Sequence, residues 1–111
     1  MKYVYIAVNK DKGLIKVGST NNIEDRQARL NIEPRERGLV IMKHAAIPSD
    51  SRAYSWAIES LLRNDLNRYA VVHTTFDTFK YNTAEFRPLS YVNHFERKVK
   101  NAIKKIGKGS L

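Results

Sequence analysis

Hydrophobic and polar positions alternate at the start of the chain and predict a pair of strands. Residues 2–8, KYVYIAV, combine β-branched with aromatic side chains, which is typical of a strand. Residues 9–13, NKDKG, form a polar segment that ends in glycine and predicts a turn. Residues 14–17 return to mostly apolar positions. The first eighteen residues therefore predict an antiparallel hairpin.

A helix is expected directly after this hairpin. Residues 18–22, GSTNN, offer several side chains that cap helices, and residues 23–30 predict the helix itself. Glu24 and Asp25 lie in its first turn, where acidic groups favour the helix dipole. The helix is expected to end before Pro34, because the residue before a proline is pushed out of helical geometry.

The middle of the chain predicts a strand, a long helix and a further strand. Residues 38–46 are almost continuously apolar, which indicates a strand at the centre of the sheet. A turn at 48–51 precedes residues 52–67, where apolar residues recur at helical spacing. Residues 71–81 are rich in Thr, Val and Phe and predict a strand, whereas 84–89 fits no single element.

The last helix has the clearest periodicity. Ser90 is a candidate N-cap, and the tail 107–110, GKGS, ends the helix. Apolar side chains repeat on one side: Val92, Phe95, Val99, Ala102, Ile103 and Ile106. Basic side chains occupy the other side, and five of them are candidate nucleic-acid contacts: Arg97, Lys98, Lys104, Lys105 and Lys108. Such a face either follows a phosphate backbone or is simply solvated.

Composition narrows the class of protein. A chain of 111 residues favours one domain over residues 1–111, and the absence of cysteine excludes disulfides and thiolate chemistry. The start of the chain has no signal-peptide pattern, so a cytoplasmic protein is expected. The net charge of +9, from 20 basic and 11 acidic residues, favours a polyanionic partner. Nucleic acid is the first expectation, ahead of an anionic membrane or an acidic protein.

An ordered set of motifs in the first thirty residues resembles a known family. Tyr3-Val4-Tyr5 lies on the first strand, and Lys16-Val17-Gly18 follows on the second, eleven positions from Tyr5 to Lys16. Arg26 comes eight residues after Gly18 on the next helix. This layout resembles the GIY-YIG nuclease superfamily, and in particular a branch common in phages whose second tripeptide reads Lys-Val-Gly. The resemblance implies an α+β fold with a small three-stranded antiparallel sheet flanked by helices, to which this chain adds its basic C-terminal amphipathic helix.

The resemblance also implies roles for individual residues. Tyr5 matches the tyrosine that helps to activate the attacking water, and Tyr3, in place of the first glycine, is a further candidate catalytic residue. Arg26 matches the arginine that stabilises charge on the phosphate, for which a guanidinium is well shaped. The alternative for Arg26 is an ion pair with Glu24 or Asp25. Arg29, one turn later, is a candidate nucleic-acid contact.

A divalent metal is part of what the resemblance implies. Glu59, on the helix 52–67, matches the family glutamate that holds Mg²⁺ or Mn²⁺, and Glu85 is its substitute. A carboxylate that faced the core of this apolar helix would need a metal or a cation beside it. His73 is a minor candidate for an auxiliary base.

Lys16 departs from the pattern of most of the superfamily, which has tyrosine there. Lysine has no phenolic hydroxyl, but its ammonium is expected to contact phosphate or to depress the pKa of Tyr5. Two hypotheses follow. The first is a metal-dependent endonuclease that acts on nucleic acid, DNA rather than RNA, with a homodimer or protein partner to supply specificity. The second is a protein on the same scaffold that binds nucleic acid or a partner with little or no cutting.

Overall fold

The computed structural model describes residues 1–34, 36–68, 72–73, 78–80 and 87–107; for 72–73, 78–80 and 87–89 it describes the backbone alone. The predicted hairpin is confirmed as β1 (Lys2–Asn9) and β2 (Leu14–Thr20), which pair antiparallel from Tyr3 opposite Thr20 to Asn9 opposite Leu14. β2 extends past the lysine tripeptide to Thr20, so Gly18 lies inside a strand and opposite Tyr5.

The sheet has the order β3-β1-β2-β5-β4, and all its pairs are antiparallel. The expected three-stranded sheet is confirmed as β2-β1-β3, where β3 is Val40–Ile47. Two short strands, β5 (Thr78–Lys80) and β4 (Val72–His73), extend it beyond β2. The single strand predicted over 71–81 is therefore two strands within the described residues.

β3 is an edge strand, so the prediction that it lies at the centre is wrong. β1 lies between β3 and β2, and within the described residues β3 pairs with β1 alone. Val40 and Met42 are 51% and 42% exposed, although both belong to the apolar run. The register also shifts opposite Ile6 and Ala7, which interrupts regular pairing. Apolar composition shows that a strand suits a sheet but does not show how many neighbours that strand has.

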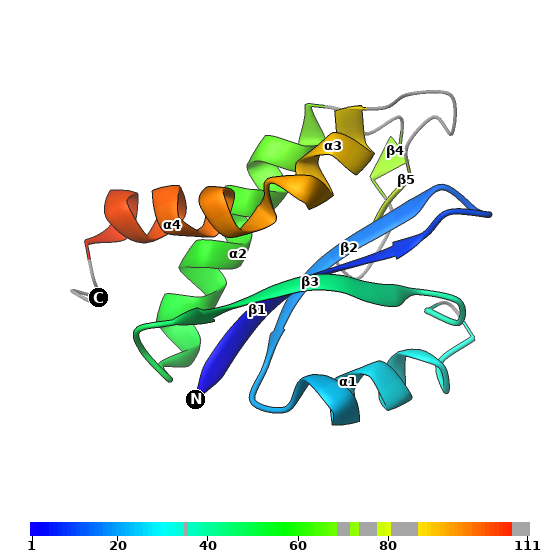
Figure 1. Ribbon diagram of the computed structural model, residues 1–111, viewed down its shortest axis with the longest axis horizontal. Coiled ribbons are helices and arrows are strands. Elements are labelled where there is room, and N and C mark those ends of the chain that lie inside the picture. Colours follow the sequence, from blue (N-terminus) through cyan, green and yellow to red (C-terminus); the bar gives the residue numbers. More distant parts are fainter. Residues whose placement is uncertain (35, 69–71, 74–77, 81–86, 108–111) are drawn as a thin grey trace.

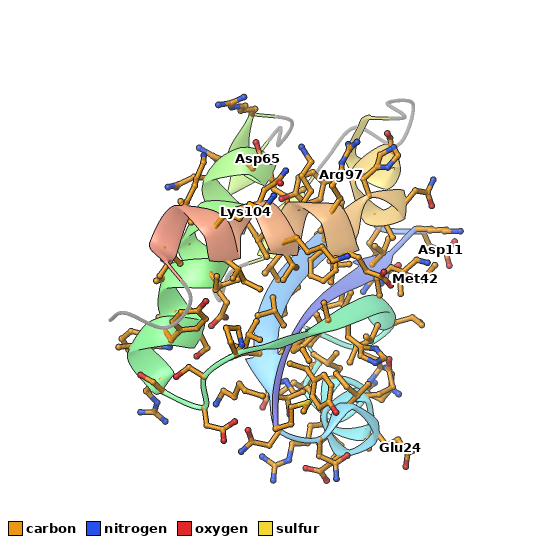
Figure 2. All side chains as sticks on the ribbon, turned by 60° about the vertical axis from the view of Figure 1, so that its left-hand side comes forward. Asp11, Glu24, Met42, Asp65, Arg97 and Lys104 are labelled. Carbon is orange, nitrogen blue, oxygen red and sulfur yellow. The ribbon has the colours of Figure 1, made fainter. Side chains whose placement is uncertain are left out.

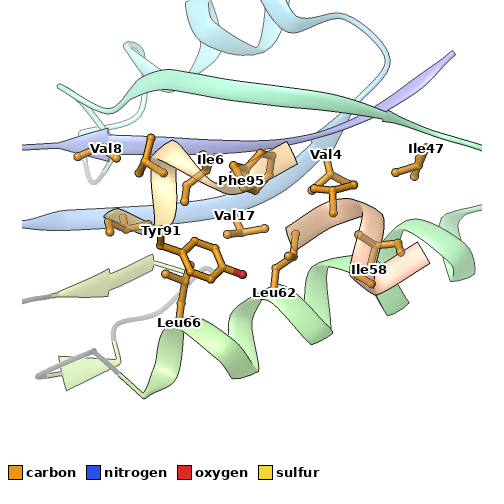
Figure 3. Close-up of a cluster of buried hydrophobic side chains, with 14 of the residues drawn as sticks. Val4, Ile6, Val8, Val17, Ile47, Ile58, Leu62, Leu66, Tyr91 and Phe95 are labelled. Atoms are coloured by element: carbon orange, nitrogen blue, oxygen red, sulfur yellow. The ribbon is translucent and has the colours of Figure 1, made fainter. Parts of the chain in front are cut away.

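Side chains that alternate along β1 enter two separate clusters on the two faces of the sheet. Val4, Ile6 and Val8 join the larger cluster, which contains residues of α2 (Arg52–Asn67), α3 (Arg87–Asn93) and α4 (Phe95–Ile106). Figure 3 shows these three side chains of β1 opposite Ile58, Leu62 and Leu66 of α2, with Tyr91 and Phe95 beside them. Burial of these side chains supplies most of the apolar driving force for folding.

The opposite face carries a smaller cluster under α1 (Ile23–Leu30). It consists of Tyr5, Ala7, Leu30 and Leu39, with Leu14, Ile23 and Ile41 against it. Figure 1 shows α1 on one side of the sheet and the other three helices on the opposite side. In Figure 2, Glu24 of α1 and Lys104 of α4 accordingly lie at opposite sides of the molecule.

Helices α1 and α2 begin and end at the predicted residues, and each has a side-chain cap. Asn22 accepts a hydrogen bond from the Asp25 backbone N–H, and Ser51 accepts one from Tyr54. The prediction of one last helix capped by Ser90 is wrong, because Ser90 lies within α3. The chain leaves helical geometry at His94, with φ −107° and ψ 15°, before α4 begins. No helix in the described part of the chain is both long and apolar enough to span a membrane.

Candidate active site

Tyr5 and Gly18 form the centre of the candidate site. Tyr5 is completely buried, and its ring lies across the backbone of Gly18, its partner in the β1–β2 pairing. A Cβ at position 18 would be 2.5 Å from the Tyr5 hydroxyl oxygen and 2.6 Å from Cζ. Contacts this short are not tolerated, so glycine at 18 is required by the tyrosine at 5.

Arg26 is joined directly to Tyr5. Its Nε donates a hydrogen bond of 3.0 Å to the Tyr5 hydroxyl, and its side chain is 29% exposed. The alternative, an ion pair with Glu24 or Asp25, does not form; Asp25 pairs instead with Arg29. The helix that carries Arg26 is held by Gln27, which donates to the Leu39 carbonyl at 2.9 Å and accepts from the Ile41 N–H at 2.7 Å. The guanidinium therefore projects from a helix clamped to the start of β3.

Electrostatics around Tyr5 favour the neutral phenol. Burial raises the pKa of Tyr5 above its ordinary value, and the carboxylates of Glu36 and Glu59 raise it further. The Arg26 hydrogen bond and charge oppose this, but burial is the larger effect. Lys16, which was expected to depress this pKa, is not among the groups that shift it. Burial alone would lower the pKa of Arg26, but the Tyr5 contact and the two carboxylates raise it, so Arg26 stays charged.

Lys16 is buried and forms an ion pair with Glu36. Its ammonium donates to Glu36 Oε2, and only 7% of the Lys16 side chain is exposed. Arg26 Nη2 lies 4.0 Å from the same oxygen. Tyr5, Lys16 and Gly18 alternate toward the α1 face of the hairpin, which places Lys16 beside the Tyr5–Arg26 pair.

Glu36 is a member of the site that the sequence did not single out. It lies in the irregular segment between α1 and β3, where no periodic pattern marks inward-facing positions. The one available signal was Lys16 on a strand between apolar neighbours, because a buried ammonium requires an anion close by. That requirement does not say which of eleven acidic residues supplies the anion.

Glu59 approaches Gly18 from the other face of the sheet. Its side chain is 8% exposed, and its Oε2 accepts a hydrogen bond of 3.2 Å from the Ser19 hydroxyl. Its Oε1 lies 3.7 Å from Arg63 Nη1, one turn later on α2. Glu59 also acts electrostatically on both Tyr5 and Arg26. The inward orientation considered from the sequence is thus the observed one, and a cation does accompany it.

These groups surround the end of β2 whose outer edge, opposite β1, has no described partner strand. β5 pairs with β2 only at Leu14–Lys16, so the outer edge of residues 17–20 is left without a described partner strand. The site comprises Tyr5, Lys16, Arg26 and Glu36 from the α1 side and Glu59 from the α2 side. A phosphate that reached this edge would lie near the partly exposed Arg26 guanidinium and near the Glu59 carboxylate.

The donor set at Glu59 is compatible with a hard divalent cation. A carboxylate and the Ser19 hydroxyl are both oxygen donors, and Mg²⁺ keeps several waters when it binds few protein groups. Within the described residues no group of three or more His, Asp or Glu side chains is placed to hold a metal ion, so the candidate ligands are Glu59 and Ser19. A metal would compete with Arg63 for Oε1.

The remaining candidates lie away from this cluster. Tyr3 makes an edge-to-face contact with His44, with ring centroids 5.6 Å apart, and lines a groove between β3 and α4. Arg29 is 68% exposed and pairs with Asp25 at 3.4 Å. Neither has a described contact with Tyr5 or Arg26. Glu85, and the side chain of His73, lie outside the described residues.

The candidate nucleic-acid contacts on α4 divide between two grooves. Lys98, Lys104 and Lys105 line a groove of about 680 Å³ between α2 and α4. Arg97 lines a second groove, of about 360 Å³, with Lys43 and Lys100. Lys98 differs from the others because it pairs with Asp65 at 3.4 Å and lies 5.2 Å from the centre of the Tyr91 ring. Lys108 falls outside the described residues.

Comparison with known proteins gives one match. The model of a protein family, the T5orf172 domain, covers residues 2–108. This domain is associated with endonuclease-like phage proteins related to the GIY-YIG group. No curated protein and no solved structure gives a significant match.

Proposed function

The chain belongs to the T5orf172 domain family, and from that premise we propose that it is a divalent-metal-dependent endonuclease that hydrolyses phosphodiester bonds, with DNA as the expected substrate. The family-level association with nuclease-like proteins supports the reaction class. The observation that carries the proposal is the contact between Tyr5 and Arg26 at Gly18, next to Glu59.

Arg26 is the group that stabilises the phosphate. Its Nε is used by Tyr5, and its Nη2 is 4.0 Å from Glu36, beyond hydrogen-bond length. The Nη groups are therefore those that approach the phosphate oxygens as negative charge develops on them. Its permanent charge and fixed orientation mean that little reorganisation is needed during the reaction.

Tyr5 acts as a neutral phenol. Its raised pKa opposes the phenolate form, so it does not serve as a strong base, and its hydroxyl instead accepts a hydrogen bond from Arg26 and orients the guanidinium. A bound Mg²⁺ or Mn²⁺ would lower the pKa of water and offset phosphate charge. Glu59 and Ser19 are the residues that would hold it.

A plasmid-nicking assay with Mg²⁺ or Mn²⁺ tests this proposal. Arg26→Ala should reduce the cutting rate about 10²–10³-fold, the usual loss when one transition-state donor is removed. Lys12→Ala is the matched control, because it removes one cation from the exposed turn at the other end of the hairpin and should cut normally. If the wild type and Arg26→Ala cut equally poorly, the proposed endonuclease function is contradicted.

A second function is favoured by one observation. Lys16 and Glu59, two groups expected to engage phosphate and metal, are each paired with a side chain of this chain, Glu36 and Arg63. This arrangement also suits a protein that binds nucleic acid without cutting. Salt-dependent binding that persists in Glu59→Ala, together with no cleavage in any divalent metal, would support that function over the first.

A further inference from the structure

Trp56 is a large apolar side chain that the fold leaves in solvent. It lies on α2, is 61% exposed, and is the only tryptophan of the chain. Its indole contributes little to the core, where Ile58, Leu62 and Leu66 of the same helix are buried. An exposed tryptophan is costly in solvent and is a common feature of binding surfaces.

Trp56 lies on the same side of α2 as the candidate metal ligand. Glu59 follows it by three residues and Arg63 by seven, spacings that place all three side chains along one stripe of the helix. Glu59 contacts Ser19 of β2, and Arg63 contacts Glu59. Leu61 and Asp65, on the other side of α2, line the groove against α4. Trp56 therefore faces away from α4 and lies one turn from the carboxylate beside the open end of β2.

Charge along this stripe suits nucleic acid. Arg52, one turn before Trp56, is exposed, and Arg63 is one turn beyond Glu59. An indole between guanidinium groups resembles the way single-stranded nucleic acids are held, with bases on aromatic rings and phosphates on cations. A tryptophan can also anchor a protein partner, but the net charge of +9 favours a polyanion.

We propose that Trp56 is a base-stacking residue that selects nucleic acid with an unpaired nucleotide at the cleavage position. A base inside an intact duplex is already stacked on both faces, so its ring is not accessible to Trp56. An unpaired base has a free face, and one helical turn, about 5 Å along the axis, separates Trp56 from Glu59. The preferred substrate is then a single strand, a flap or a branch. This inference rests on the proposed nuclease function and specifies its substrate.

The chain has one tryptophan, so tryptophan fluorescence reports on Trp56 alone and tests the proposal directly. The probes are a single-stranded oligonucleotide, a hairpin with a single-stranded tail, a blunt duplex and an abasic strand, all with chelator present so that none is cut. Binding is followed independently by the anisotropy of labelled probes. The single strand and the tailed hairpin should quench Trp56, whereas the abasic strand and the blunt duplex should bind with little quenching.

Substitution provides the second readout. Trp56→Ala should weaken single-strand binding about 5-fold to 150-fold, the equivalent of about 1–3 kcal/mol of stacking, and should leave blunt-duplex binding unchanged. Trp56→Phe should restore most of the loss. Met42→Ala, another exposed apolar side chain but on β3, is the matched control and should bind as the wild type does.

The possible outcomes distinguish a failure of this inference from a failure of the proposed nuclease function. A single strand that binds without quenching Trp56, or an abasic strand that quenches it equally, overturns the role of Trp56 while the nuclease proposal stands. Self-association lost in Trp56→Ala, with fluorescence unchanged by nucleic acid, also overturns it. Absence of both binding and cutting overturns the proposed function together with the inference.

Discussion

At the scale of single residues, Tyr5 and Gly18 depend on each other. The phenol occupies the space that a side chain at 18 would take, and Arg26 hydrogen-bonds to the phenol oxygen from the next helix. The two tripeptides of the resemblance are thus in direct contact, through the register that places Tyr5 opposite Gly18. The two short motifs that are separate in the sequence therefore contain residues that pack directly against each other in the fold.

The ion pair of Lys16 with Glu36 gives a stability prediction. Glu36→Gln leaves a buried ammonium without its carboxylate and should cost about 3 kcal/mol of unfolding free energy. Lys16→Met combined with Glu36→Gln should cost clearly less, because neither charge is then buried. Urea denaturation of the two single variants and the double variant measures this; a double variant as unstable as Glu36→Gln would show that the pair is not the cause.

The raised pKa of Tyr5 gives a prediction in the alkaline range. The folded state keeps the phenol neutral, so its contribution to stability is fully present below about pH 10 and is lost as pH rises through the higher folded pKa. The wild type should therefore lose more stability between about pH 8 and about pH 11 than Tyr5→Phe does. Thermal unfolding at both pH values measures the difference, and an equal loss in both proteins would contradict it.

At the scale of elements, the orientation of α1 decides where Arg26 lies. Asn22 caps its first turn, and Gln27 bonds to the backbone on either side of Val40, at the start of β3. One helix of eight residues is thereby fixed at its start and at its middle. An isolated helix this short is not stable in water, so these contacts with the rest of the fold hold it.

Removal of the Asn22 N-cap should lower the stability of α1. Asn22→Ala loses the acceptor for the Asp25 N–H and should cost about 1 kcal/mol. Asn22→Asp keeps an acceptor and should remain close to the wild type. The nicking rate of Asn22→Ala should fall far less than that of Arg26→Ala, since Gln27 still holds the helix. A loss as large as that of Arg26→Ala would mean that the cap itself determines the position of the guanidinium.

At the scale of the whole molecule, the helix α4 and the Tyr5–Arg26 part of the candidate site lie on opposite faces of the sheet. α1 and its cluster cover one face of the sheet, and α4 packs over the other, on β3 and α2 (Figures 1 and 2). The open end of β2 lies across β1 from β3. If α4 holds nucleic acid as proposed, its lysines would add affinity for the substrate but would not take part in the reaction.

The lysines of α4 should accordingly affect binding and its salt dependence. Lys104→Gln with Lys105→Gln should lower the slope of log affinity against log salt by about 2, one for each lost phosphate contact, with the cutting rate at saturating substrate unchanged. Lys98→Gln is the informative comparison. Its ammonium is held by Asp65 and Tyr91, so its loss should reduce stability more than the salt slope.

Sequence alone determined the elements whose signals are local. The hairpin, α1, α2 and their caps follow from alternation, helical spacing and side chains that bind the nearest backbone groups. Arg26 and Tyr5 were chosen as candidates from the resemblance of short motifs to a family, and the structure brings the two into contact. These predictions needed no knowledge of what packs against what.

Tertiary structure decided everything that depends on a distant partner. Whether β3 has one neighbour or two, whether the last helix continues through His94, and which anion reaches Lys16 are set by segments far apart in the chain. Glu36 is twenty residues from Lys16, and Glu59 is forty from Ser19. Burial and charge pairing act through space, so they become readable only when the sheet brings these residues together.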